Sequence, residues 1–282
     1  MRVLPAALLV LGFFSQTVGT AHGQSALRRT AAIQPVGLAR KGDLLLGVGA
    51  AYESNVSRPL VAVFGDLGHL GALKLAWAVA DYVLLEVEGD LLRVLTVDSM
   101  GTPPINPRPE VFNGKSTAAG DFSVAFSFLI LGDGDGLGVG GRLKVDLPNS
   151  NQKDGIGTNT TNVHLSLLGS YGRGPFQFTG NVGVGILEVP LESFRQNDVI
   201  VYSAEMLVSP LADVRLRLLG GVDGRASTRN KVPIGTEDLG EAYLGLDFRF
   251  GDWLIDAAAG LGYAGNSPDW KVEGGLAFLI NG

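Results

Sequence analysis

The chain has 282 residues, with 22 Lys and Arg against 28 Asp and Glu, and so a formal net charge of −6. This mild negative charge argues against a nucleic-acid-binding protein, which normally presents a basic patch. The chain contains no cysteine, which excludes disulfides, thiolate metal sites and a cysteine nucleophile. Its 41 glycines are about twice the usual share, so the composition is unlike that of an ordinary soluble enzyme.

The first 23 residues have the features of a secretory signal peptide. Arg2 gives a positive start, residues 4–14 form an apolar run, and small residues follow at the possible cleavage sites 19–21 and 21–23. The run is too short to cross a ~30 Å bilayer as a helix, and a buried N-terminal helix is the alternative. We therefore expect 1–23 to be a signal peptide and 24–41 to be a periplasmic segment or a plug.

From residue 42 onward, apolar residues alternate with polar residues or glycine. Within 136–147, for example, Leu143 and Val145 fall on one side and Arg142 and Lys144 on the other, because side chains along a strand have a period of two. Twelve such segments predict strands at 42–53, 70–79, 82–92, 121–131, 136–147, 162–171, 176–187, 199–209, 213–223, 241–250, 252–264 and 270–281.

The connections between these segments alternate between long and short. The long ones fall at 54–69, 93–120, 148–161, 188–198 and 224–240. Outer-membrane barrels have short periplasmic turns and long external loops, and an even strand number places both termini in the periplasm. The sequence therefore predicts an all-β fold for 42–282, an antiparallel transmembrane β-barrel of about 12 strands in the outer membrane. The proline-rich loop 93–120 is expected to fold inward or to cover the mouth.

The apolar face of each strand is expected to meet lipid and the polar face to line the lumen. The reverse arrangement, a soluble barrel with an apolar cavity, is the alternative. The charged and histidine residues of the polar face are the candidate lumen-lining residues. They are Lys74, Glu86, Glu88, Asp90, Asp121, Arg142, Lys144, Asp146, His164, Glu205, Arg215, Arg217, Asp247, Arg249, Asp256, Lys271 and Glu273. These charges either select solutes along a channel or pair across the lumen and close it.

One short motif suggests chemistry. His164 and Ser166 lie on the same face of a predicted strand, and a histidine beside a serine is the arrangement that activates a serine nucleophile. The pair lies on the expected lumen face, whereas a lipid-cutting site should meet lipid. Ordinary polar lumen residues are therefore the favoured interpretation, and a membrane-embedded lipid hydrolase is a third hypothesis.

Three short segments carry a family resemblance: 120–124 (Gly-Asp-Phe-Ser-Val), 144–148 leading into 154–158, and 180–183. In this order they resemble the Gram-negative outer-membrane transporter family known as "MetA-pathway of phenol degradation" proteins. The resemblance covers roughly residues 40–282. It implies a barrel that takes up small compounds, hydrophobic ones among them.

The function expected from the sequence is a passive channel or transporter for small molecules. The alternative is a structural or partner-binding barrel whose lumen is blocked by salt bridges. We expect no enzyme activity, no cofactor and no metal site. The expected partners are outer-membrane lipid, the barrel-assembly machinery and a small solute that the sequence does not identify, and no nucleic acid.

Overall fold

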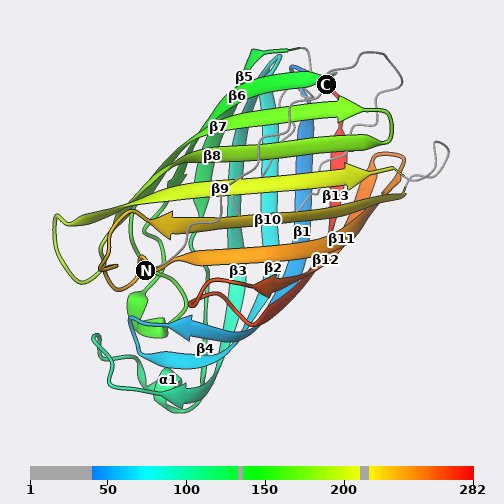
Figure 1. The fold of residues 1–282 in the computed structure, drawn as a ribbon. Helices are drawn as coiled ribbons and strands as arrows, with labels where there is room; N and C mark the ends of the chain where they lie inside the picture. Colours follow the sequence, from blue (N-terminus) through cyan, green and yellow to red (C-terminus); the bar gives the residue numbers. More distant parts are fainter. Residues whose placement is uncertain (1–39, 133–135, 210–215) are drawn as a thin grey trace.

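The computed structural model describes residues 40–132, 136–209 and 216–282 (Figure 1). The signal peptide expected at 1–23 and nearly all of the segment 24–41 lie outside these residues. The described chain is almost entirely β-structure. Its strands are β1 (Leu44–Arg58), β2 (Val63–Ala80), β3 (Val83–Met100), β4 (Lys115–Ala118), β5 (Ser123–Leu131), β6 (Leu137–Asp146), β7 (Asn162–Arg173), β8 (Phe176–Glu188), β9 (Gln196–Val208), β10 (Leu216–Ser227), β11 (Leu239–Phe250), β12 (Trp253–Gly262) and β13 (Trp270–Ile280). The helices are the short α1 (Pro109–Phe112) and the 3₁₀ turn η1 (Gln152–Asp154).

These strands close into a barrel of twelve. Each strand pairs antiparallel with its neighbours in the order β2, β1, β13 and then down to β5 and β3, and the β2–β3 pairing closes the ring. The thirteenth strand, β4, pairs with residues 93–96 of β3, while β5 pairs with residues 83–88. β4 and β5 therefore form one interrupted wall strand, and the predicted fold of about 12 antiparallel strands is confirmed.

The two ends of the barrel differ. At one end, the turn end, two-residue turns at 81–82, 174–175 and 251–252 join neighbouring strands. The start of β1 and the end of β13 lie there too, since Leu44 pairs with Ile280. The other end, the loop end, carries α1, β4 and the connections 147–161, 189–195 and 228–238 (Figure 1).

The predicted boundaries of the first three strands were wrong. β1 and β2 are joined by only four residues, 59–62, and β3 continues to Met100, so most of 54–69 and 93–100 is strand rather than loop. The reason is a pair of irregularities in the β1–β2 ladder, one at Gly71 of β2 (φ 63°) and one at Asn55 of β1 (φ 53°). A β-bulge adds a residue to one strand and exchanges its two faces, which breaks the period-two pattern in the sequence.

The outer face of the barrel is apolar. Neighbouring residues on β6 show the contrast, since Leu143 is 42% exposed and Arg142 is 4% exposed. Exposed aromatic side chains occur towards both ends of the strands: Trp77, Phe176, Phe250 and Trp253 at the turn end, and Tyr52, Tyr263 and Trp270 at the loop end. An apolar band between two aromatic girdles is the surface of an outer-membrane barrel.

No helix in the described part of the chain is long and apolar enough to span a membrane.

An apolar cluster closes one side of the loop end. It joins Val61 and Val63 at the β1–β2 connection to Leu95 of β3, Val111 of α1 and Ile156 of the connection 147–161. Gly155 precedes Ile156 and ends η1 in the left-handed region, with a φ of 70°. A Cβ at this position would lie 3.0 Å from the Leu95 side chain, so glycine fits there best. Both the α1 connection and 147–161 therefore pack over the β1–β3 side of the mouth.

An ion pair between the exposed Arg108 and the buried Asp154 joins these two connections. The Arg108 guanidinium lies 3.0 Å from a carboxylate oxygen of Asp154, and the Arg108 N–H donates to the Lys153 carbonyl at 3.0 Å. Burial raises the pKa of the Asp154 carboxyl, and the Arg108 charge opposes this change.

Candidate functional site: the inner wall and mouth cavity

The structure places the predicted lumen residues on the inner face of the barrel wall or beside it. Ten are buried: Lys74, Glu86, Glu88, Asp90, Arg142, Glu205, Arg217, Asp247, Asp256 and Lys271. Six are half-buried: Asp121, Lys144, Asp146, His164, Arg249 and Glu273. Asp121 lies in the break between β4 and β5, where its carboxylate accepts the Thr158 N–H at 3.0 Å. Arg215 lies outside the described residues.

Five of these residues form one ion-pair network, which we call the charged layer: Lys74, Glu86, Glu88, Arg142 and Lys144. Lys74 Nζ lies 3.7 Å from Glu86 Oε2 and 3.3 Å from Glu88 Oε1. Arg142 Nη2 lies 3.4 Å from Glu86 and 3.7 Å from Glu88, and Lys144 Nζ lies 3.9 Å from Glu88. The layer thus joins β2, β3 and β6.

Small residues on β5 make the charged layer possible. β5 lies between β3 and β6, so their backbones are roughly 9–10 Å apart, twice the usual spacing of neighbouring strands. Its inward positions are Ser123, Ala125 and Ser127, which leave room for the glutamates of β3 to meet the cations of β6. Ser127 Oγ also donates to Glu86 Oε1 at 3.0 Å.

The layer continues along the wall towards the loop end. Asp146 lies 3.5 Å from Lys144 Nζ and 3.1 Å from His164 Nε2. Among the described contacts, His164 and Ser166 share no hydrogen bond, so the nucleophile–base geometry of a hydrolase is not formed.

Smaller clusters line the other walls. Arg217 Nε donates to Asp247 Oδ1 at 2.8 Å, and Lys271 Nζ lies 2.9 Å from Glu273 and 3.7 Å from Glu241. Tyr243 of β11 donates to Glu205 of β9 at 3.1 Å, passing over Gly221 of β10. A Cβ at Gly221 would lie 2.5 Å from the Tyr243 hydroxyl, so a residue without a side chain is needed there.

Sequence reasoning missed one cluster that spans β1 to β3. His69 Nε2 lies 3.4 Å from Glu53, and His69 Nδ1 lies 3.1 Å from Asp90, which also pairs with Arg93 Nε at 2.6 Å. His69 and Arg93 fall in segments that were predicted as loops. The glycine at 71, inside an otherwise apolar run, is the sequence signal for the bulge that places them inward.

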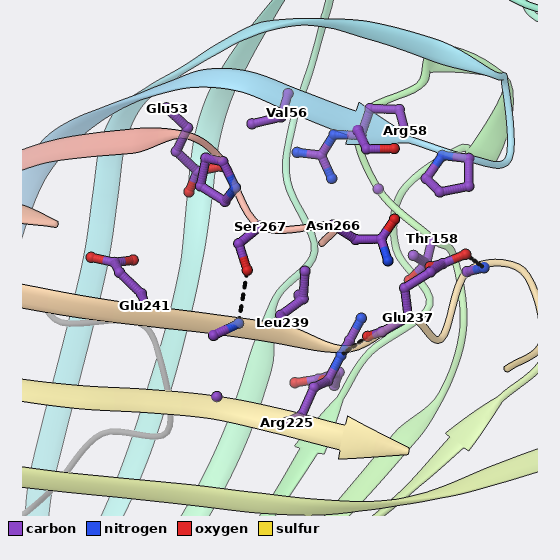
Figure 2. A pocket seen from close by; sticks show the side chains of 18 of the residues that line it. Glu53, Val56, Arg58, Thr158, Arg225, Glu237, Leu239, Glu241, Asn266 and Ser267 are labelled. Atoms are coloured by element: carbon purple, nitrogen blue, oxygen red, sulfur yellow. Dashed lines mark hydrogen bonds between the residues drawn. The ribbon is translucent and has the colours of Figure 1, made fainter. Parts of the chain in front are cut away.

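A cavity of about 360 Å³ lies inside the loop half of the barrel. We call it the mouth cavity, and Figure 2 shows its wall. It is bounded by β1, by β6 to β11 and by β13, together with the connections 59–62, 147–161, 228–238 and 263–269. Of the predicted residues, Arg142, Lys144, Asp146, His164 and Lys271 line it. Arg58 and Arg225, which the sequence did not single out, line it too.

Solved structures with a similar fold are outer-membrane barrels. The COG4313 outer membrane channel from Pseudomonas putida F1 matches 87% of this chain and 98% of its own, with a TM-score of 0.60 and 15% identity. The NanC porin matches 83% and 98%, with a TM-score of 0.52 and 10% identity. The translocator domain of the autotransporter NalP from Neisseria meningitidis matches 86% and 90%, with a TM-score of 0.52 and 12% identity. The fold is therefore that of Gram-negative outer-membrane β-barrels.

Sequence comparisons add no family. No protein-family model matches the chain, and no curated protein matches it. The resemblance to the phenol-degradation transporter family therefore stays a prediction.

Proposed function

We propose that the protein is an outer-membrane channel through which small molecules pass passively, with its turn end and both termini in the periplasm. The observation that carries the proposal is a cavity, lined by charged and apolar side chains together, inside a closed barrel whose outer face is apolar. Backbone groups in lipid must be bonded within the protein, and a closed barrel meets this demand. The similarity to barrels that include a channel and a porin supports the same interpretation.

The charged layer is the proposed constriction of this channel. Lys74, Glu86 and Arg142 lie on the inner wall, and each is no more than 4% exposed. Rings and clusters of charged side chains set solute selectivity in pores. With this constriction, the channel would be narrow and would pass only small solutes, hydrophobic ones among them.

Conductance in planar bilayers tests the proposal. Purified, folded protein is expected to give small, discrete conductance steps. Ser166→Trp, which places a large side chain in the mouth cavity, is expected to reduce the step size. Leu165→Trp is the matched control, because the neighbouring side chain points outward and is 64% exposed. A folded protein that shows no steps, or equal steps in both variants, would contradict the channel.

The second candidate is a structural barrel that presents its loops to a partner. The burial of the charged layer and of the Arg217–Asp247 pair favours it, because paired charges fill the lumen at those positions. This function requires that folded protein conduct no ions and pass no solute into liposomes, so the same measurement separates the two candidates.

A further inference from the structure

Two arginines of the mouth cavity form no direct ion pair with a carboxylate among the described residues. More distant carboxylates still act on them electrostatically: Glu53 and Asp121 on Arg58, and Glu237, Asp146 and Asp238 on Arg225. Arg58 is the last residue of β1, and Arg225 lies near the loop end of β10. Within the described residues, the Arg58 side chain forms no ion pair, and its buried Nε has no hydrogen-bond partner. In the same part of the chain Arg225 also forms no ion pair, and its Nε donates to the Glu237 backbone carbonyl at 2.9 Å.

The carboxylates around the cavity are already engaged. Asp146 contacts Lys144 and His164, Glu241 contacts Lys271, and Glu53 contacts His69. The Glu237 carboxylate accepts the Gly235 N–H at 2.8 Å, and Asp223 is only 3% exposed. A cationic solute would have to compete with these partners, whereas an anion meets two guanidinium groups that are not directly paired with a carboxylate in the described part of the chain.

Figure 2 shows Arg58 and Arg225 on different walls of the same cavity, with Asn266 between them in this view. Arginine presents a planar fork of N–H donors that matches a carboxylate, and it keeps its charge at any ordinary pH. Apolar side chains complete the wall near Arg58, among them Val56, Leu60 and Ile156. The cavity therefore offers anion recognition next to an apolar surface.

We infer that the mouth cavity binds a small monoanionic carboxylate with a compact apolar body, held between Arg58 and Arg225. The inference rests on the proposed channel, because it names the class of solute that enters at the loop end. A volume of about 360 Å³ corresponds to roughly a dozen water molecules and lies in the range of small-molecule sites. It accommodates an aromatic carboxylate.

Titration calorimetry on the folded full chain in detergent tests the site with three probes of one shape. Benzoate carries the carboxylate, benzamide is its neutral counterpart, and benzylammonium carries a cation. Benzoate is expected to bind about tenfold or more tightly than benzamide, because benzamide lacks the charge-assisted hydrogen bonds to the arginines. Benzylammonium is expected to bind most weakly of the three. Equal affinity for benzoate and benzamide would overturn the inference.

Variants of the two arginines locate the site. Arg58→Gln and Arg225→Gln are each expected to weaken benzoate binding about tenfold and to leave benzamide binding unchanged. Arg58→Lys keeps the charge without the fork, so partial retention is expected. Arg229→Gln, on the exposed connection after β10, is the matched control and should bind as the parent does. Parent-like benzoate binding in Arg58→Gln and Arg225→Gln would place the site elsewhere.

Failure of the channel and failure of the site give different results. Benzoate binding that depends on both arginines, in a protein without conductance, would refute the channel and keep the site. Conductance steps that benzoate does not alter, together with no calorimetric binding, would refute the site and keep the channel.

Discussion

The charged layer and the mouth cavity lie in one lumen, but their arginines differ in whether they form direct ion pairs. Arg142 is 4% exposed and lies within 4 Å of two glutamates on β3. Arg58 also has a buried Nε, yet it has no ion pair among the described residues. Burial and ion pairing are therefore separate properties of a lumen charge: Arg142 is directly paired, and Arg58 is not.

The local sequence explains the difference. At the charged layer, Ala125 and Ser127 on β5 let the long side chains of β3 and β6 meet across an intervening strand. At Arg58 the strand ends, and the neighbouring wall is the apolar cluster of Val61 and Ile156. Among the described residues the Arg58 guanidinium forms no direct ion pair there, and Glu53 and Asp121 act on it only from a longer distance. We therefore propose that its N–H donors remain available to a solute.

Arg142→Met should give the largest effect. It leaves Glu86 and Glu88 with fewer counter-charges inside the barrel, and breaking a buried pair typically costs about 3–5 kcal/mol. The free energy of unfolding, measured by urea titration in detergent or liposomes, should fall by about this amount.

A compensating variant checks the cause. Glu86→Gln combined with Arg142→Met removes charges of both signs, so it should recover part of the lost stability. An Arg142→Met protein as stable as the parent would mean that the charged layer does not hold its residues as pairs.

Leu165→Arg tests the contrast between the two faces of the wall. Leu165 points outward and is 64% exposed, next to the inward Ser166 of β7. An arginine on the lipid face near mid-membrane costs about 2–4 kcal/mol and less near an interface. The decrease in the free energy of unfolding of Leu165→Arg, measured in lipid vesicles, should fall in this range. Thr161→Arg is the control: it lies in the exposed connection before β7, so its free energy of unfolding should change little. Equal small costs for both would argue that this face does not meet lipid.

Alternation in the sequence was sufficient to predict much of the fold. From β5 to β13 the wall strands follow a period of two, apart from one irregularity between Leu129 and Leu131 of β5, and their ranges were predicted to within a few residues. The inward side of Lys74, Glu86 and Arg142 followed from the same pattern. A period of two assigns faces directly, so these predictions needed no tertiary information.

The rest depended on information that alternation does not carry. The bulge at Gly71 exchanged the faces of β2, so His69 could not be placed inward. Ion pairing between β3 and β6 depends on the order of the strands in the barrel, which places β5 between them, and on the small size of the inward residues of β5. The mouth cavity depends on how 147–161 folds over the barrel, where Ile156 packs against residues nearly a hundred positions away in the sequence.

Arg58→Met should give the smallest effect on stability and so completes the comparison with Arg142→Met. Methionine keeps the apolar length of the side chain beside Val56 and Leu60 and removes a charge that forms no direct ion pair among the described residues. The free energy of unfolding should therefore be unchanged or rise by up to about 1 kcal/mol, under the same urea titration. The two variants remove the same group from the same lumen, so the difference between them isolates the effect of pairing. If Arg58→Met were as destabilising as Arg142→Met, Arg58 would be a structural charge like those of the charged layer, and the distinction between the two regions would not hold.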